Sequence, residues 1–110
     1  MDRNSLEQRV RDGILFDCYG AMLTEKQRSA CEMIFSLDLS LAEAAETLGV
    51  SRQGVHDLLT RSRERMEEYE AAFGAAAGRR KTEKLLRLVE EYRDRLPIDF
   101  YDKVKEISEA

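Results

Sequence analysis

The stretch SLAEAAETLGVSRQGVHDLLTRSRERM, residues 40–66, decides the fold because it predicts two helices joined by a tight turn. Ser40 can act as an N-cap and Glu43, three residues on, completes a capping box, so a helix is expected to begin at Leu41. Gly49 ends this helix, since glycine takes the left-handed conformation of a helix C-terminus at no steric cost. Two helices with so short a connection form a helix-turn-helix.

The second helix of the motif is predicted to start after Ser51, a further N-cap. Its apolar and small side chains recur at helical spacing and predict a buried face. The members of that face are Val55, Leu59, Ser62 and Met66. Because the pattern continues through Tyr69 and Phe73 to Gly74, the helix is expected to be about 30 Å long, longer than a minimal recognition helix.

Two helices are predicted before the motif. The first covers residues 3–20, where Gly13 suggests close packing against a neighbouring element. Its apolar stripe consists of Leu6, Val10, Ile14 and Cys18, with Leu15 and Tyr19 beside it, and Phe16 and Tyr19 are the expected aromatic anchors. The second covers residues 25–36, after a second capping box at Thr24. Its predicted buried residues are Ala30, Met33, Ile34 and Leu37.

Beyond the motif the chain is predicted to bend and then to form two more helices. Gly74 and Gly78 can each break a helix, so residues 71–80 are expected to form a weak hinge. A fifth helix is expected over residues 79–95, and a last short one is expected to be capped by Asp99. The fifth helix carries a narrow apolar seam suited to helix pairing, made of Leu85, Leu88, Val89, Tyr92 and Leu96.

The run FDCYGAMLTEKQRSACEMIFSLDLSLAEAAETLGVSRQGVHDLLTRSRERMEEYE, residues 16–70, resembles the YlxM family of small bacterial helix-turn-helix proteins. The pieces that make the resemblance specific are YG..LT.KQ and VSRQ.V.D, and SLAEAAETLGVSRQGV is similar to the second half of sigma-factor region 4. The family is implicated in the signal recognition particle pathway, because its genes neighbour those of the targeting GTPase. The resemblance therefore implies a regulatory role, and it weakens from Gly74 onward.

These patterns predict an all-α protein: a helical bundle with a sigma-region-4-like helix-turn-helix, followed by a C-terminal helical extension. Charged residues make up 36% of the chain, Pro occurs once, and apolar residues follow a helical period. Residues 1–73 are expected to form the helix-turn-helix domain and residues 74–110 the extension. Because the long fourth helix and the apolar seam leave more apolar surface than so small a bundle covers, the extension is predicted to form a homodimer.

The exposed face at the start of the helix after Ser51 is the predicted DNA-reading surface. Arg52 can form two hydrogen bonds with guanine and Gln53 two with adenine, and both positions match base-reading residues of sigma region 4. Among the bases, Asp57 can accept a hydrogen bond only from the amino group of cytosine, and its negative charge otherwise repels phosphates. The expected recognition residues are Arg52, Gln53, His56, Asp57, Thr60 and Arg61. Further backbone contacts are expected from Thr24, Lys26, Arg79, Arg80 and Lys81.

The charge of the chain is unevenly distributed. Its formal net charge is −4, and residues 24–73, which contain the predicted DNA-reading surface, hold six basic and ten acidic residues. Since neutralisation of phosphates supplies much of the affinity for DNA, binding must depend on a local basic patch or on dimerisation, or is absent. Arg63 and Arg65 either contact phosphate or lie on a solvated helix face with pairs such as Arg63 with Glu67.

Two functions therefore stay open. The first is a DNA-binding regulator that acts as a homodimer. The second is a non-catalytic adaptor that uses the motif as a scaffold to bind protein or signal recognition particle RNA of the targeting machinery. The acidic charge of the motif favours the adaptor, and the basic run from Arg79 to Lys84 is suited to RNA.

The sequence offers no support for catalysis, a cofactor or a metal site. It has one His, no Gly-rich phosphate loop and no nucleophile with a base at a recognisable spacing. Its two cysteines, Cys18 and Cys31, have no CxxC spacing and are expected to be reduced thiols on helix faces. Because no signal peptide or membrane-length apolar run is present, the protein is expected to be cytoplasmic and not to bind membranes.

Overall fold

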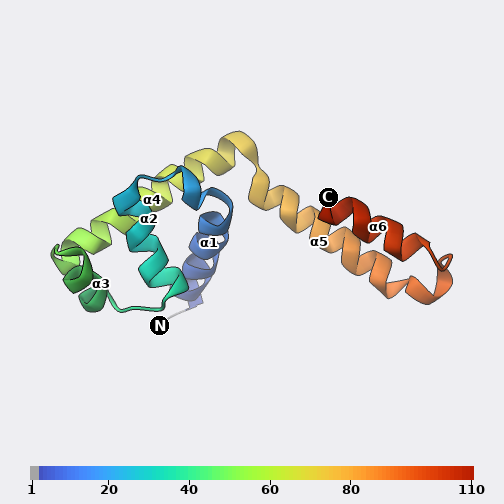
Figure 1. Ribbon diagram of the computed structural model, residues 1–110, viewed down its shortest axis with the longest axis horizontal. Coiled ribbons are helices and arrows are strands. Elements are labelled where there is room, and N and C mark those ends of the chain that lie inside the picture. The colour runs from blue at the N-terminus through green and yellow to red at the C-terminus, as the bar shows by residue number, and fades with distance from the viewer. Residues whose placement is uncertain (1–2) are drawn as a thin grey trace. The chain divides into compact units, whose positions relative to one another are not determined.

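The computed structural model describes residues 3–110, and the chain divides into two compact units, Met1–Gly74 and Ala75–Ala110. We call them the N-terminal unit and the C-terminal unit. The described residues form helices and turns and no strand, so the all-α prediction is confirmed (Figure 1). The helices of the N-terminal unit are α1 (Arg3–Tyr19), α2 (Glu25–Cys31), α3 (Leu41–Leu48) and α4 (Arg52–Phe73). Those of the C-terminal unit are α5 (Ala75–Glu91) and α6 (Phe100–Glu109).

Helices α3 and α4 form the predicted helix-turn-helix, and its capping residues act as expected. The hydroxyl of Ser40 accepts a hydrogen bond from the Glu43 amide at 3.1 Å, and the Glu43 carboxylate accepts one from the Ser40 amide at 3.1 Å. Gly49 has a φ of 69°, in the left-handed region that favours glycine. Ser51 caps α4 by accepting from the Gly54 amide at 2.9 Å. These local bonds fix the turn between the two helices.

The core of the N-terminal unit lies where α4 packs against α1, α2 and α3. Around the motif it is a cluster of small and branched side chains, Ile34, Ala44, Ala45 and Val55. The predicted buried face of α4 is confirmed at Val55, Ser62 and Met66, whereas Leu59 is only partly buried at the edge of that cluster. Alanine at the α3 contact allows the two helices to approach closely, which holds the motif rigid.

The buried face of α1 differs from the predicted stripe. Three members of that stripe are exposed, Leu6, Val10 and Ile14. The buried residues are Leu15 and Tyr19, which were expected beside the stripe, and Asp12, which was not; the three recur at i, i+3 and i+7 from Asp12. Because α4 offers polar and charged partners to Asp12 and Tyr19, α1 turns that face toward α4. The close packing predicted at Gly13 is also wrong, since a β-carbon there would meet no atom within 4 Å.

The segment between α2 and α3 is less regular than predicted. After Cys31 the helix continues as a π turn over Glu32–Ser36, which rotates the following side chains relative to an α-helix. Leu37, predicted to be buried, is therefore exposed. Asp38 takes a φ of 55°, rare for a residue with a side chain, and its carboxylate pairs with Arg9 at 3.0 Å. Arg9 thus holds the chain just before the motif.

Of the two glycines in the predicted hinge, only Gly74 ends a helix. Helix α4 runs without a break, as predicted, and ends at Gly74, whose φ is 63°. Gly78 does not break a helix, because it lies inside α5, which begins at Ala75 rather than at residue 79. The alanines between Gly74 and Gly78 favour this continuation. Helix α5 also ends at Glu91, four residues earlier than predicted.

The C-terminal unit is a pair of helices with no buried side chain among residues 75–110. An open groove of about 360 Å³ lies on it, lined by Leu88, Val89, Tyr92, Leu96 and Phe100. Several other large apolar side chains are exposed in this unit, namely Leu85, Ile98 and Ile107. The cap predicted at Asp99 is wrong: its side chain makes no capping hydrogen bond and pairs instead with Lys103 at 2.8 Å.

Candidate nucleic-acid interface

The first half of α4 carries the expected recognition residues, which we call the recognition face. The serine cap at Ser51 fixes where the helix begins, and in its first turn Arg52 and Gln53 are exposed whereas Val55 is buried in the core. The face consists of two adjacent rows spaced by one helical turn, Arg52, His56 and Thr60 in one, and Gln53, Asp57 and Arg61 in the other. All six are exposed except Thr60, which is half-buried. The structure therefore presents these side chains together on one helix surface.

Two contacts organise the recognition face. The Gln53 side-chain amide donates a hydrogen bond from Nε2 to Oδ1 of Asp57 at 3.0 Å. The same carboxylate oxygen lies 3.9 Å from Nδ1 of His56. Asp57 thus lies between the two, with a hydrogen bond to Gln53 and the His56 ring nearby. Its negative charge is partly engaged by its neighbours rather than directed only at solvent.

The cations of the N-terminal unit fall into two groups. One group is held by carboxylates: Arg9 by Asp38, Arg11 by Glu67, Arg63 by Asp12 and Arg65 by Glu68. The other group is exposed and has no ion pair among the described residues, and it consists of Lys26, Arg28, Arg52 and Arg61. The unpaired cations lie on α2 and on the first half of α4, whereas most of the paired ones lie on α1 and on the second half of α4.

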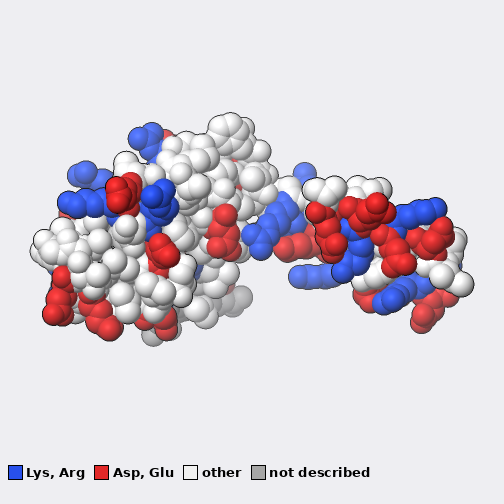
Figure 2. Space-filling view, in the orientation of Figure 1, with Lys and Arg blue, Asp and Glu red and all other residues white. Residues whose placement is uncertain are grey.

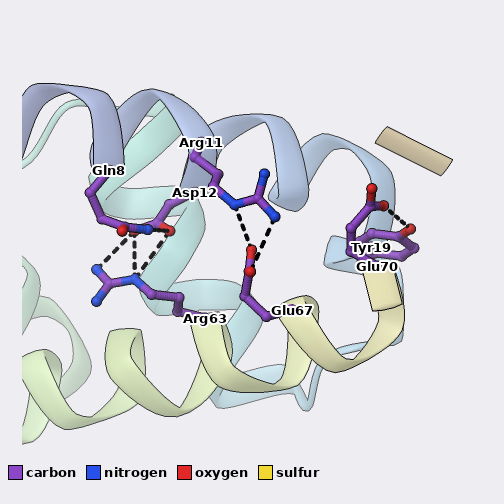
Figure 3. Close-up of polar contacts among 7 residues, drawn as sticks. All are labelled: Gln8, Arg11, Asp12, Tyr19, Arg63, Glu67 and Glu70. Atoms are coloured by element: carbon purple, nitrogen blue, oxygen red, sulfur yellow. Dashed lines mark hydrogen bonds and ion pairs between the residues drawn. The ribbon is translucent and has the colours of Figure 1, made fainter. Parts of the chain in front are cut away.

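The second half of α4 is bound to α1 by a row of polar contacts (Figure 3). Arg63 donates from Nε to both carboxylate oxygens of Asp12, at 3.1 and 2.9 Å. One turn further on, Arg11 donates two hydrogen bonds to Glu67, at 2.7 and 3.1 Å. Tyr19 then donates to Glu70 at 2.5 Å. The pair expected between Arg63 and Glu67 is therefore wrong, because each has a partner on α1 instead.

These contacts give the acidic half of α4 a structural role. The carboxylates of Glu67 and Glu70 face α1, so their charge is offset by Arg11 or engaged by a hydroxyl. Glu67 also raises the pKa of Arg11, mainly through its hydrogen bonds. With its second half anchored in this way, α4 is held firmly while its first half presents the recognition face.

The charge distribution on the surface follows the same division. In the N-terminal unit, Lys and Arg side chains gather near the upper left edge, over the region of α2 and the start of α4 (Figure 2). Asp and Glu side chains predominate along the lower edge. The net acidic charge of the motif thus conceals a local basic patch, which is what contact with a phosphate backbone requires.

The predicted backbone contacts are all exposed, and they are distributed over both units of the chain. Thr24 and Lys26 lie at the start of α2, where the Thr24 hydroxyl accepts from the Gln27 amide at 3.2 Å. Arg79, Arg80 and Lys81 belong to the C-terminal unit, and Arg79 pairs with Glu83 at 3.3 Å. Arg28 was missed by sequence reasoning. Only its lack of a carboxylate partner distinguishes it, and that depends on the folded structure.

The remaining reactive side chains lie apart from this face. Cys31 is buried and Cys18 half-buried, and both are free thiols. Burial raises the pKa of Cys31, although a hydrogen bond with Ser62 acts in the opposite direction. The described part of the chain contains no group of three His, Cys, Asp or Glu side chains that could hold a metal ion. Within residues 3–110, no helix combines the length and the apolarity that crossing a bilayer requires.

Comparison with known proteins identifies similar sequences along most of the chain. Residues 6–108 match the family model of UPF0122, whose description reads "Putative helix-turn-helix protein, YlxM / p13 like". A UPF0122 protein of Staphylococcus haemolyticus is 46% identical over 71 residues, which span 64% of each chain. A UPF0122 protein of Symbiobacterium thermophilum is 42% identical over 77% of this chain and 79% of its own length. A third, from Clostridium kluyveri, is 36% identical over 91% of this chain and 94% of its own.

Proposed function

We propose that this chain, which belongs to the UPF0122 family of YlxM/p13-like helix-turn-helix proteins, is a non-catalytic DNA-binding regulator. The observation that supports this most directly is the division of the cations. Four of them are exposed without an ion pair among the described residues, and they lie on α2 and on the first half of α4. A helix-turn-helix that contacts DNA needs its cations free at these positions.

In the proposed complex the first half of α4 lies in the major groove. Arg52 donates two hydrogen bonds to O6 and N7 of guanine, and Gln53 reads adenine. Arg61, Lys26 and Thr24 contact phosphates, which position the helix but carry no sequence information. His56 and Thr60, one and two turns from Arg52, reach the neighbouring bases.

A single copy would bind weakly. With Lys26 and Arg61 as its phosphate-neutralising cations, one copy predicts a slope of about −2 for log K against log salt, at the low end for specific DNA-binding proteins. We therefore include in the proposal that the protein acts as a homodimer through residues 74–110, with residues 1–73 as the DNA-binding domain. Two recognition helices about one DNA turn apart would read a palindrome.

The C-terminal unit supports a partner copy in two respects. Residues 75–110 bury no side chain of their own, and so small a unit is expected to need further burial to be stable. Its charges of both signs are interspersed over the visible surface (Figure 2). With nine basic and eight acidic residues from 74 to 110, two copies would not repel each other strongly.

The proposal is tested by fluorescence anisotropy with a random-sequence duplex library over a salt series. We expect salt-dependent binding, and a sequence enriched from the library should bind Arg52→Ala about 5- to 150-fold more weakly, which corresponds to the loss of a bidentate base contact. Arg65→Ala is the matched control, because Arg65 is paired with Glu68 and lies on the second half of α4. Absence of binding at low salt, or an equal loss in both variants, would contradict the proposal.

A second candidate function is favoured by the basic residues of α5. Arg80, Lys81 and Lys84 are exposed and have no ion pair among the described residues, although they lie outside the helix-turn-helix. Arginine-rich helices serve as RNA contacts, and the resemblance to the YlxM family connects the chain with protein targeting. The alternative is therefore an adaptor that binds signal recognition particle RNA or protein. Charge reversal at Arg80 and Lys81 would abolish that binding, whereas Arg52→Ala would leave it unchanged.

A further inference from the structure

The hydrogen bond between Gln53 and Asp57 fixes the orientation of an amide on the recognition face. Gln53 lies one helical turn before Asp57, and its Nε2 donates to Oδ1 at 3.0 Å. A carboxylate can accept hydrogen bonds but cannot donate them, so the NH₂ group of the amide must face Asp57. The amide oxygen Oε1 is consequently directed away from Asp57. Without this partner the amide could rotate by 180° and exchange its two ends.

An amide fixed in this way matches one base edge better than the others. After one N–H is given to Asp57, Gln53 retains one N–H donor and one carbonyl acceptor. Adenine presents one acceptor and one donor in the major groove, N7 and the N6 amino group. Guanine presents two acceptors, N7 and O6, so the Gln53 oxygen would face another oxygen.

We propose that Asp57 is a positioning residue that makes Gln53 select adenine over guanine. This rests on the proposed DNA-binding function and deepens it by naming the base pair that the face prefers opposite Gln53. It also accounts for a carboxylate on a surface that meets phosphates. Asp57 reduces overall affinity through its charge but increases discrimination, since specificity is a difference of affinities and is improved by disfavouring the wrong base.

The two effects of Asp57 can be measured separately. A sequence enriched by the wild-type protein from a randomised duplex library is resynthesised with each A·T pair replaced in turn by G·C. We expect the wild type to lose about 10-fold in affinity at one such position, the usual scale for a bidentate contact. Gln53→Ala should remove this preference at the same position and at no other.

The decisive variant is Asp57→Ala. We expect it to bind all duplexes more tightly, because a negative charge is removed, and to distinguish adenine from guanine by less than about 3-fold, since the free NH₂ group can then donate both of its N–H groups to O6 and N7 of guanine. Asp57→Glu, which keeps an acceptor within reach at i+4, should restore the preference. Glu64→Ala is the matched charge control on α4: it should raise affinity similarly and keep the full preference.

The outcomes distinguish this inference from the function on which it rests. If Asp57→Ala is folded by circular dichroism and keeps the wild-type preference for adenine, the positioning role is overturned while DNA binding stands. A stabilising role for Asp57 in the helix alone would change the melting temperature and leave base choice unaltered. If the library yields no enriched sequence, the DNA-binding function fails, and this inference fails with it.

Discussion

Arg63 of α4 holds the buried carboxylate of Asp12 on α1, with Nη2 2.8 Å from Oδ2. The Asp12 side chain is only 4% exposed, whereas that of Arg63 is 40% exposed. Gln8 completes the contact by donating to Oδ1 of Asp12 at 2.8 Å. Asp12 and Arg63 are 51 positions apart in sequence, so the pair joins α1 to α4 and fixes the position of α4. The carboxylate depends on this pair more than the guanidinium does, because the guanidinium can still reach water.

The unequal burial of this pair predicts unequal costs of removing its members. Arg63→Ala leaves a buried carboxylate with Gln8 alone, and we expect it to lower the free energy of unfolding by about 2–4 kcal/mol. Asp12→Ala should cost less, because Arg63 can be solvated. Urea unfolding followed by circular dichroism measures both. Arg65→Ala removes an exposed pair of 3.9 Å and should cost no more than about 0.5 kcal/mol. Equal losses in the three variants would contradict this account.

Substitution by alanine should change the free energy of unfolding in opposite directions at Gly13 and Gly49. Gly13 lies within α1, and a methyl group added there would meet no atom within 4 Å, so Gly13→Ala should raise the free energy of unfolding by about 0.5–1 kcal/mol. Gly49 has a φ of 69°, so Gly49→Ala should lower it by about 1 kcal/mol. Urea unfolding of both variants, at an unchanged m-value, tests the pair. Destabilisation by Gly13→Ala would show that α1 packs against something at that position.

The C-terminal unit contains a phenol–carboxylate interaction whose loss should be visible on both sides of neutral pH. Glu90 and Tyr101 perturb each other's pKa, and Arg93 lies 4.4 Å from the centre of the Tyr101 ring. Their interaction lowers the pKa of Glu90 from its ordinary 4.5 and raises that of Tyr101 from 10.0. The stability that comes from the lowered pKa of Glu90 is present above pH 4.5 and is lost as the pH falls through the pKa of Glu90 in the folded state. The stability that comes from the raised pKa of Tyr101 is present below pH 10 and is lost as the pH rises through the pKa of Tyr101 in the folded state.

Tyr101→Phe should therefore raise the pKa of Glu90 toward 4.5 and flatten both limbs of the stability profile. Carbon-detected NMR of the Glu90 carboxyl measures the pKa directly, and thermal unfolding at several pH values measures stability. Tyr92→Phe is the control, because it removes a phenol hydroxyl from the same unit and leaves both Tyr101 and Glu90 in place. An unchanged Glu90 titration in Tyr101→Phe would show that Tyr101 does not perturb this carboxylate in solution.

Local signals in the sequence were sufficient for the helix-turn-helix. The capping boxes at Thr24 and Ser40 and the left-handed glycine at Gly49 each act within a few residues, so their chemistry determines where helices begin and end. The same holds for the long α4, which stops at Gly74. Membership of the YlxM-like family, expected from short sequence pieces, is confirmed by a match over residues 6–108.

Features that depend on distant residues were not predictable in the same way. The apolar stripe of α1 suggested a buried face, but Asp12 is buried instead because Arg63 lies opposite it. The separation of paired from unpaired cations likewise depends largely on contacts distant in sequence, such as Arg11 with Glu67 and Arg63 with Asp12, so Arg28 could not be recognised as a candidate. The contact between Gln53 and Asp57 is local, at i and i+4. Its proposed role in reading a base also requires that both side chains be exposed, as they are in the structure.

The proposed homodimer makes a prediction that separates two exposed apolar surfaces. Leu88 lies in the groove of the C-terminal unit and Leu6 on the exposed stripe of α1, and both are more than half exposed. Light scattering after size-exclusion chromatography should give twice 12.7 kDa for the wild type at micromolar concentration. Leu88→Asp should give the monomer mass, because a charge would be buried between the copies, and Leu6→Asp should leave the dimer intact.

The same two variants connect assembly with DNA binding. If two copies engage one DNA, the second contact forms at a high effective concentration, so Leu88→Asp should weaken binding to a palindromic duplex much more than to a half-site. Leu6→Asp should bind both duplexes as the wild type does. The reverse pattern would place the contact between copies on α1. A monomeric wild type that binds as tightly as Leu88→Asp would instead mean that one recognition face suffices, and dimerisation would have no part in the function.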